Sequence, residues 1–594
     1  MRLRYLHLRN YSPIEDIALC FRAPVLKDRE CSIRFVVGIN GSGKTHLLQA
    51  IAETFLALAR QQRPHFPVTL AWELGEGERR RTLIFDSPGQ GQEAAWWQSD
   101  LLIDDISNEE DWDELITELR SGNEAWRPLI DEGNWPGKGT GLPMTVLTYT
   151  TGNLESWQRL FDEPPSADVD SQLEDYDMSL ERPIGWSLRQ ELDYQASQGT
   201  EESLKVVQNL QELAEEASVS EHDQNVCLLL TPTLLKFALL AVSLPQAMQE
   251  YRQYTTDEDV ETFKQNIQDI ADTEQTGLRR LLSQVGWLWP VSVVFHIDFN
   301  LEAWSESARQ QKGSILKALY ILANEVVREP EPSTQRRLFF DLKSTCQLDE
   351  YSRQADYADI IDQFFGGDEF DYVGDALQEF ISRAETSPFE GFNRLVNLHQ
   401  EGLLTDIQIA VRKADIDDLL LFDELSDGEQ VYLGRMALFH LLAGESDALL
   451  ILDEPEVHFN DKWKREIVDI IDDVLKEKAN DVLIATHSSI ALTDVFSDEI
   501  ILFDKQDGQS VYVDINTNTF GSDPSEVMIR LFGVPDGVGQ RAMEYLEERI
   551  QEDYWTPDRR SELEDLINNI GPGFYRTELR LILKRLENAA SSTT

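Results

Sequence analysis

The residues best placed to do chemistry begin at Gly38, where a glycine-rich run follows an apolar segment. Residues 32–37 have the composition of a buried strand, and residues 46–60 carry apolar side chains at helical spacing. Glycines between a strand and a helix let backbone N–H groups close around an anion at the helix N-terminus. This context predicts a phosphate-binding loop, made of Gly38, Asn40, Gly41, Ser42, Gly43, Lys44 and Thr45.

Two residues of this loop carry side chains with defined chemistry. We expect the ammonium of Lys44 to reach the β- and γ-phosphates of a nucleotide, and the Thr45 hydroxyl to bind Mg²⁺. The sequence therefore predicts ATP and Mg²⁺ as cofactors, and gives Lys44 a part in binding and in catalysis.

Such a loop needs a carboxylate on a neighbouring strand to hold the metal. Residues 448–452 form an apolar run typical of a buried parallel strand, and Asp453 and Glu454 follow it. We expect Asp453 to bind the metal and Glu454 to polarise the attacking water. A third strand, residues 481–486, ends at His487, whose place downstream of the acidic pair favours a sensor of the γ-phosphate.

The class of ATPase is indicated by residues 425–430, Leu-Ser-Asp-Gly-Glu-Gln, which open a helix-like stretch upstream of Asp453. With the Asp-Glu-Pro-Glu of residues 453–456 and the Thr-His-Ser of residues 486–488, this motif resembles the ABC superfamily. Within it, the motifs look like the branch of structural-maintenance-of-chromosomes (SMC), RecF and OLD ATPases. The chain also resembles stand-alone AAA-family ATPases of prokaryotic restriction and anti-phage defence systems.

The resemblance implies how the site is completed. In that superfamily the signature serine and glycine of one head close over the γ-phosphate held by the other head. By resemblance, Ser426 and Gly428 act in trans, Glu454 is the catalytic base, and His487 is the switch histidine. Glu429, in the same motif, is expected among the nucleotide-binding residues. A serine at a helix N-terminus supplies a donor and a positive dipole, which agrees with this role.

Two features depart from the family pattern. Asp427 stands where the first signature glycine is usual, and it adds negative charge near a phosphate. No glutamine occupies a clear Q-loop context, and a strand at residues 144–149 lies roughly in its place. The residue that couples the two lobes therefore stays unassigned.

Most of the chain separates Lys44 from Asp453, far more than one nucleotide-binding sheet requires. We expect an α/β fold: a P-loop NTPase of the ABC type with a two-lobed ATPase head, a large mainly helical insertion between the lobes, and a helical C-terminal extension. The expected segments are lobe I at 1–155, the insertion at 156–405, lobe II at 406–520 and the extension at 521–594.

The insertion occupies the place where the relatives carry long coiled-coil arms. No heptad pattern is sustained over three or four repeats in it, so we expect a compact helical cap with a little sheet. Helices are expected at 201–217, 257–272 and 314–328, and strands at 291–299 and 337–343.

The net charge of −55, from 108 acidic and 53 basic residues, opposes non-specific attraction to nucleic acid. A salt-tolerant host or a basic partner subunit would also explain it. The N-terminus lacks the pattern of a signal peptide. The apolar run 227–244 is interrupted by Pro232 and Lys236, which favours a buried helix over a membrane span. We expect a cytoplasmic protein without membrane contact.

Two further features suggest other surfaces. The strand ending in Asp341-Leu-Lys343 has the Asp-x-Lys form of a restriction-type nuclease, and Asp298 ends the other strand of the insertion; a salt bridge at a strand end is the preferred interpretation. The segment 90–141 is rich in tryptophan, and packing of a subdomain or a partner surface is favoured over base stacking, because carboxylates surround it. The tryptophans are Trp96, Trp97, Trp112, Trp126 and Trp135.

Three functions remain. The first is an ATPase subunit that dimerises on ATP and regulates a co-encoded effector in a prokaryotic defence system. A nuclease is the favoured class of effector. The alternative is a RecF-like DNA-repair or chromosome ATPase acting directly on DNA. A transporter subunit is disfavoured, because transporter heads keep their motifs close together. The acidic charge favours the first function, with a homodimer of heads and with DNA contacted through a complex.

Overall fold

The structure, a computed structural model, shows two compact units, Met1–Phe520 and Gly521–Thr594. It describes residues 1–22, 29–89, 93–100, 106, 108–123, 125–129, 141–162, 226–253, 282, 285–299, 306–330, 333–367, 369–382, 387–413, 418–506, 508–534, 538–551 and 554–591.

The first unit is built on a seven-stranded sheet with the order β18-β17-β3-β16-β15-β8-β9. Its neighbouring strands are parallel except for the β17–β18 hairpin. The strands β3, β8, β15 and β16 are buried along their whole length, as expected for strands covered on both faces. Their bounds are β3 Ser32–Gly38, β8 Thr145–Thr150, β9 Cys227–Leu229, β15 Ala448–Asp453, β16 Asp481–Ala485, β17 Ile500–Gln506 and β18 Gln509–Val513.

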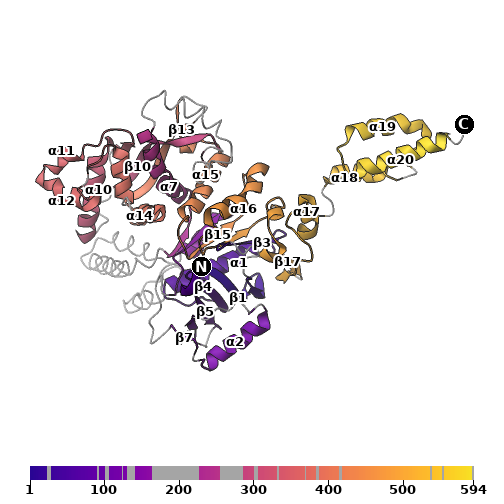
Figure 1. Cartoon of the computed structure of the whole chain (residues 1–594), viewed down its shortest axis with the longest axis horizontal. Coiled ribbons are helices and arrows are strands. Elements are labelled where there is room, and N and C mark those ends of the chain that lie inside the picture. The colour runs from indigo at the N-terminus through magenta and orange to yellow at the C-terminus, as the bar shows by residue number, and fades with distance from the viewer. Residues whose placement is uncertain are drawn as a thin grey trace, which may run out of the picture. The chain divides into compact units, whose positions relative to one another are not determined.

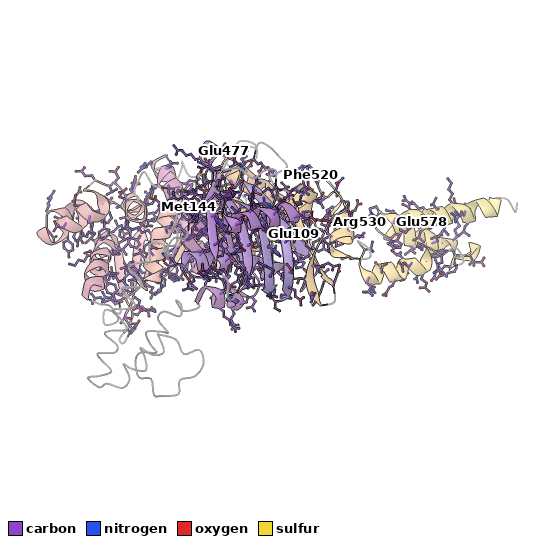
Figure 2. All side chains as sticks on the ribbon, turned by 90° about the horizontal axis from the view of Figure 1, so that it is seen from below. Glu109, Met144, Glu477, Phe520, Arg530 and Glu578 are labelled. Atoms are coloured by element: carbon purple, nitrogen blue, oxygen red, sulfur yellow. The ribbon has the colours of Figure 1, made fainter. Side chains whose placement is uncertain are left out.

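A six-stranded antiparallel sheet forms a second layer of this unit. The helix α1 (Lys44–Ala59) lies between the two sheets, and its buried side chains join both in one core. Figure 2 looks onto the antiparallel sheet, where Glu109 marks the start of α2 (Glu109–Ser121). The strands are β1 Arg2–Tyr11, β2 Ile14–Cys20, β4 Val68–Leu74, β5 Arg81–Ser87, β6 Ala95–Ser99 and β7 Arg127–Pro128.

The tryptophans of this layer pack inside the protein. Trp96 belongs to the core around α1, whereas Trp97, Trp112 and Trp126 form a second cluster beneath α2 with Tyr5, which stacks on Trp112 at 4.9 Å between ring centroids. These four side chains are buried, so they serve packing; Trp135 lies outside the described residues.

A five-stranded antiparallel sheet, β11-β12-β10-β13-β14, forms the centre of the inserted region. Figure 1 shows it with α7, α10 and α14, away from α1 and β1 of the same unit. The strands are β10 Trp287–Asp298, β11 Glu325–Arg328, β12 Gln335–Asp341, β13 Leu404–Lys413 and β14 Leu419–Leu421. The helices are α7 Pro232–Gln253, α10 Glu306–Leu322, α11 Leu348–Ser352, α12 Ala355–Phe365, α13 Val373–Ile381 and α14 Pro388–Gln400.

The helix α7 is the buried centre of this region. It begins at Pro232, as the sequence predicts, and it contacts α13, α14, α15 (Asp427–Leu441), β10 and β13. Phe237 and Leu240 are fully buried, so this apolar helix belongs to the core, as the sequence predicts. Within the described residues, no helix is long and apolar enough to cross a membrane.

Other expectations for the insertion differ from the structure. The helix expected at 314–328 ends at Leu322, and Glu325–Arg328 instead forms β11 against β12, because Val326 and Val327 favour an extended pairing. The helices expected at 201–217 and 257–272 lie outside the described residues. The short strand β9 lies in the segment 156–405, yet it pairs with β8 of the head.

The remaining helices of the first unit are α3 (Leu154–Asp162) and α16 (Asp461–Leu475). The second unit is helical, and its core includes Leu563 and Leu579, both fully buried. Its helices are α17 Pro524–Phe532, α18 Gln540–Arg549, α19 Arg560–Asn569 and α20 Phe574–Ser591. Helix α19 ends just before the Gly-Pro-Gly of residues 571–573, after which α20 begins.

Candidate nucleotide-binding site

The glycine-rich loop follows β3 at once and leads into α1, as the sequence predicts. Gly38, Gly41 and Gly43 have positive φ angles of 150°, 76° and 98°. A Cβ atom on Gly38 would lie 2.2 Å from the carbonyl oxygen of Phe503, and one on Gly43 would lie 2.5 Å from Oγ of Ser510. Glycine is therefore required at Gly38 and Gly43 for two reasons. The φ angles are positive, and atoms of neighbouring strands occupy the space that a side chain would need.

The Lys44 ammonium folds back onto this loop. Its Nζ atom donates to the carbonyl oxygens of Gly38 and Ile39 at 3.0 and 3.2 Å. Burial lowers the pKa of Lys44, although the carboxylates of Glu454 and Asp453 oppose that shift. The ammonium thus lies beside the loop and in the field of both acidic residues. Of the other loop residues, Ser42 is buried and Asn40 is exposed.

Asp453 ends β15 between two parallel neighbours, β16 and β8. Its carboxylate oxygens lie 3.1 and 3.2 Å from Oγ1 of Thr45, at the start of α1. Burial raises the pKa of Asp453, and the hydroxyl of Thr45 counteracts the rise. The structure therefore brings together the two residues that the sequence proposes as metal ligands.

The spacing of these oxygens fits Mg²⁺. Two ligand atoms at right angles on an octahedral ion are about 3 Å apart, because each lies about 2.0–2.1 Å from the metal. The 3.1 Å between Thr45 Oγ1 and Asp453 Oδ1 matches that separation. In the described part of the chain, no three His, Cys, Asp or Glu side chains gather as a metal site. An ion here would accordingly take its other ligands from water and substrate phosphates.

Glu454 turns out of the strand beside His487. Its φ angle is 53°, a left-handed value uncommon for a residue other than glycine, and its amide donates to the carbonyl oxygen of Ala485 at 2.9 Å. Its Oε1 atom lies 3.2 Å from Nε2 of His487. Burial, together with the charge of Lys44, lowers the pKa of His487, and Glu454 opposes this. The imidazole is therefore neutral near pH 7 and offers one donor and one acceptor.

Glu456 holds the turn that carries His487, a role that the sequence did not reveal. Its buried carboxylate accepts hydrogen bonds from the hydroxyl of Thr486 and, at 3.2 Å, from the amide of His487. Burial raises the pKa of Glu456. The second glutamate of the Asp-Glu-Pro-Glu motif was the available signal, because a buried carboxylate needs partners of this kind.

Two threonines at the C-terminal end of β8 are further residues that sequence reasoning missed. The hydroxyl of Thr150 donates to Oδ2 of Asp453 at 3.2 Å. The amide and hydroxyl of Thr151 donate to the carbonyl oxygens of Asp453 and Glu454 at 3.2 and 2.8 Å. This strand lies roughly where a Q-loop glutamine was sought. Polar residues at the C-terminal end of an apolar strand were the signal, since such ends meet at one edge of a parallel sheet.

The signature residues lie at the start of α15 and not beside the loop of their own chain. Ser426 caps the helix and is exposed, as is Asp427. In the described residues, the hydrogen bonds of the Ser426 side chain go to Glu429. A Cβ atom on Gly428 would lie 3.3 Å from the carbonyl oxygen of His458, which leaves little room for any larger residue. Figure 1 shows α15 next to α7, whereas α1 lies beside β3.

One buried arginine joins α15 to the edge of the sheet that carries Asp453 and Glu454. Arg435, on α15, donates to the carbonyl oxygen of Val457 at 3.1 Å and to the hydroxyl of Tyr149 at 2.9 Å. Its guanidinium also lies 5.0 Å from the ring centroid of Phe459. Tyr149 precedes Thr150, so Arg435 connects α15 both with the turn after Glu454 and with the end of β8.

The nuclease-like residues of the inserted region, Asp298 and Asp341, do not come together as a site. In the register of β10 and β12, Asp298 is opposite Gln335 and Asp341 is opposite Ser292. Six positions along a strand correspond to roughly 20 Å, so the two carboxylates cannot share a metal. Asp341 is exposed, and its carboxylate accepts from the amide of Lys343 at 3.2 Å. This contact closes a turn after the strand.

The strand order, the loop after β3 and the Asp453–Glu454 pair at the end of β15 define the fold of a P-loop ATPase. The family model described as "AAA domain, putative AbiEii toxin, Type IV TA system" matches residues 336–494, from β12 through the signature helix to the turn after His487. No curated protein matches the chain significantly.

Solved structures of SMC heads are similar to this chain at low identity. The head domain of Pyrococcus furiosus, bound to the C-terminal domain of ScpA, is 11% identical with a TM-score of 0.27, over 86% of this chain and 96% of that chain. The head domain of Thermotoga maritima is 10% identical with a TM-score of 0.29, over 87% and 100%. That of Pyrococcus yayanosii is 14% identical with a TM-score of 0.28, over 87% and 97%.

Proposed function

We propose that this chain hydrolyses ATP in a composite site formed when two heads associate as a homodimer. The observation that carries the proposal is the separation within one chain. Lys44, Asp453, Glu454 and His487 form one connected group, whereas Ser426 is exposed at the start of α15. An exposed helix N-terminus with a serine suits a phosphate presented by another molecule.

The roles proposed for the residues follow from their positions. Lys44 exchanges the loop carbonyls for the β- and γ-phosphates, and the backbone amides between Gly38 and Thr45 surround those phosphates. Thr45 and Asp453 would hold Mg²⁺, which neutralises the charge that develops between the phosphates. Glu454 orients water for attack on the γ-phosphorus and accepts its proton.

His487 completes the group in this proposal. Its neutral ring donates from one nitrogen, and rotation away from Glu454 would direct that donor to the γ-phosphate. Ser426 and Gly428 of the second copy close over the same phosphate, with Glu429 positioning the serine. The positive end of α15 adds to the attraction. Two copies related by a twofold axis would form two such sites.

We further propose that the ATP-bound dimer regulates a co-encoded effector, a nuclease by preference, in a prokaryotic defence system in the cytoplasm. The description of the matching family, which names a putative toxin of a toxin–antitoxin system, supports a role within a system of partners. The net charge of −55 supports contact with DNA through a complex. The separation of Asp298 and Asp341 supports an effector supplied by another protein.

Complementation between two inactive variants tests the composite site. Lys44→Ala removes the phosphate-binding ammonium, and Ser426→Arg blocks the signature. Each variant alone should lose ATPase activity, whereas a mixture should recover part of it, because each heterodimer contains one intact site. The readout is phosphate release, with different affinity tags on the two chains to measure heterodimers formed with ATP.

The matched control is Asn108→Arg, an exposed position at the start of α2 that belongs to none of the nucleotide-site motifs. It should keep parental activity. In a mixture with either inactive variant, it should give no more activity than its own fraction of the chains accounts for. Heterodimers that form with ATP and still release no phosphate would overturn the proposal that Ser426 acts in trans.

A further inference from the structure

Glu429 engages every polar group of Ser426 that a phosphate would need. Its Oε2 atom accepts from the Ser426 amide at 3.0 Å and from the Ser426 hydroxyl at 2.8 Å. The amide of Glu429 donates in return to the Ser426 hydroxyl oxygen at 3.4 Å. A serine hydroxyl has a single hydrogen to donate. It therefore cannot donate to a phosphate oxygen while it donates to Glu429.

The other oxygen of this carboxylate is held from a different part of the fold. Nζ of Lys413, at the end of β13, lies 2.7 Å from Oε1 of Glu429, and both side chains are largely buried. Lys413 and the hydrogen bonds from Ser426 lower the pKa of Glu429 against the effect of its burial. The ion pair neutralises a carboxylate that would otherwise face an incoming phosphate.

The strand that carries Lys413 belongs to the five-stranded sheet of the inserted region. β13 pairs with β10 along its length, so a shift of that sheet would move Lys413. A second lysine fixes the segment just before the signature. Lys236, on α7, lies 3.0 Å from Asp406 of β13 and 3.1 Å from Asp423, in the short helix Phe422–Glu424. Two lysines thus tie residues 423–429 to the inserted region.

We propose that the Lys413–Glu429 ion pair is a gate by which the inserted region controls whether the Ser426 hydroxyl is available to the γ-phosphate of a second head. The inference rests on the proposed composite site. While Lys413 neutralises Glu429, a phosphate approaches, and the Ser426 hydroxyl donates its hydrogen bond to the phosphate instead of to Glu429. When Lys413 is withdrawn, Glu429 keeps the hydroxyl and its charge repels the phosphate.

The gate predicts that substitutions in the ion pair change the association of two heads. They should leave the nucleotide affinity of a single head unchanged, since Ser426 does not line the loop of its own chain. We would make each variant in the Glu454→Gln chain, so that ATP is not consumed. Sedimentation with ATP and Mg²⁺ gives the dimer dissociation constant. A fluorescent ATP analogue gives the nucleotide affinity at protein concentrations where heads are separate.

Lys413→Met should raise the dimer dissociation constant by at least about tenfold, as expected for a partner charge left unpaired at an interface. Nucleotide affinity should stay unchanged. Lys413→Arg should retain association near that of the parent. Glu429→Gln should tighten association, because a neutral amide neither repels phosphate nor holds the hydroxyl as strongly. In the Glu429→Gln background, Lys413→Met should change the dimer dissociation constant by less than about twofold, because the carboxylate that interacts with Lys413 is already absent.

Lys476→Met is the matched control, since Lys476 makes an exposed ion pair with Asp473 at 3.6 Å. It should leave both constants unchanged. A dimerising parent whose Lys413→Met variant associates equally well would overturn the gate alone, as would a tenfold loss that persists in the Glu429→Gln background. A parent that stays monomeric with ATP would overturn the gate and the composite site together.

Discussion

Nε2 of His487 lies 3.2 Å from Oε1 of Glu454, although the two residues end different strands. Their meeting follows from the parallel pairing of β15 with β16, in which Asp453 is opposite Ala485. The residues after those positions emerge at the same edge of the sheet. The left-handed backbone of Glu454 then directs its side chain toward the histidine.

This contact predicts separable effects of two substitutions. Glu454→Gln should lower the ATPase rate by about 10²–10⁴-fold, because the group that accepts the proton from water is lost. Nucleotide binding should survive, since Lys44, Thr45 and Asp453 remain, and ATP-bound dimers should accumulate. His487→Ala should lower the rate by about 10²-fold through loss of one donor to the γ-phosphate. Phosphate release and gel filtration with ATP measure both; a Glu454→Gln chain that turns over at the parental rate would contradict the assignment.

Thr150 provides a test of how Asp453 is positioned. Thr150→Val keeps the shape of the side chain but removes the hydroxyl that donates to the carboxylate at 3.2 Å. The Mg²⁺ concentration needed for half-maximal nucleotide binding should rise by about tenfold, the usual scale for a lost contact behind a metal ligand. Thr150→Ser is the control and should stay near the parent. Identical Mg²⁺ titrations for the valine variant and the parent would exclude this positioning role.

His440, in the last turn of α15, predicts a pH dependence of stability. Burial lowers its pKa to about 4, below the value of about 6.5 for an unfolded chain. Between these values the unfolded chain binds more protons, so stability increases with pH. The contribution is complete above pH 6.5, and about 3 kcal/mol is lost as the pH falls toward 4.

Thermal unfolding at several pH values measures this term. His440→Gln should unfold at a temperature that varies less between pH 4.5 and pH 7 than that of the parent. His65→Gln is the control, because the side chain of His65 is 75% exposed. Equal pH slopes for His440→Gln and the parent would contradict the burial argument.

The separation of Asp298 and Asp341 along their strands predicts that these two residues do not form a nuclease site. Incubation with plasmid, ATP and Mg²⁺ or Mn²⁺ should leave the DNA intact, and Asp341→Ala should behave like the parent. Binding to duplex DNA should be weak at physiological salt, because acidic residues outnumber basic residues by 108 to 53. Cleavage lost on Asp341→Ala would instead assign a nuclease to the inserted region. Tight, salt-sensitive binding without cleavage would favour the RecF-like alternative.

The sequence by itself determined the glycine-rich loop, its flanking strand and helix, and the acidic pair at the end of β15. These features are local: glycines at fixed positions, an apolar run and a change of periodicity specify them without reference to distant residues. The start of α7 at Pro232 was predictable for the same reason. The division into four segments at 155, 405 and 520 stays a prediction.

Only the tertiary structure decided which distant residues meet. Thr150 and Arg435 belong to no motif, and the motif that contains Glu456 does not specify its partners. Thr150 reaches Asp453, Glu456 reaches His487 and Arg435 reaches Tyr149 because of strand order and helix packing. The link from Lys413 to Glu429 likewise depends on β13 joining the sheet of β10. Short-range patterns fix a residue's local conformation, but a hydrogen bond between elements depends on their packing, which no single stretch of sequence encodes.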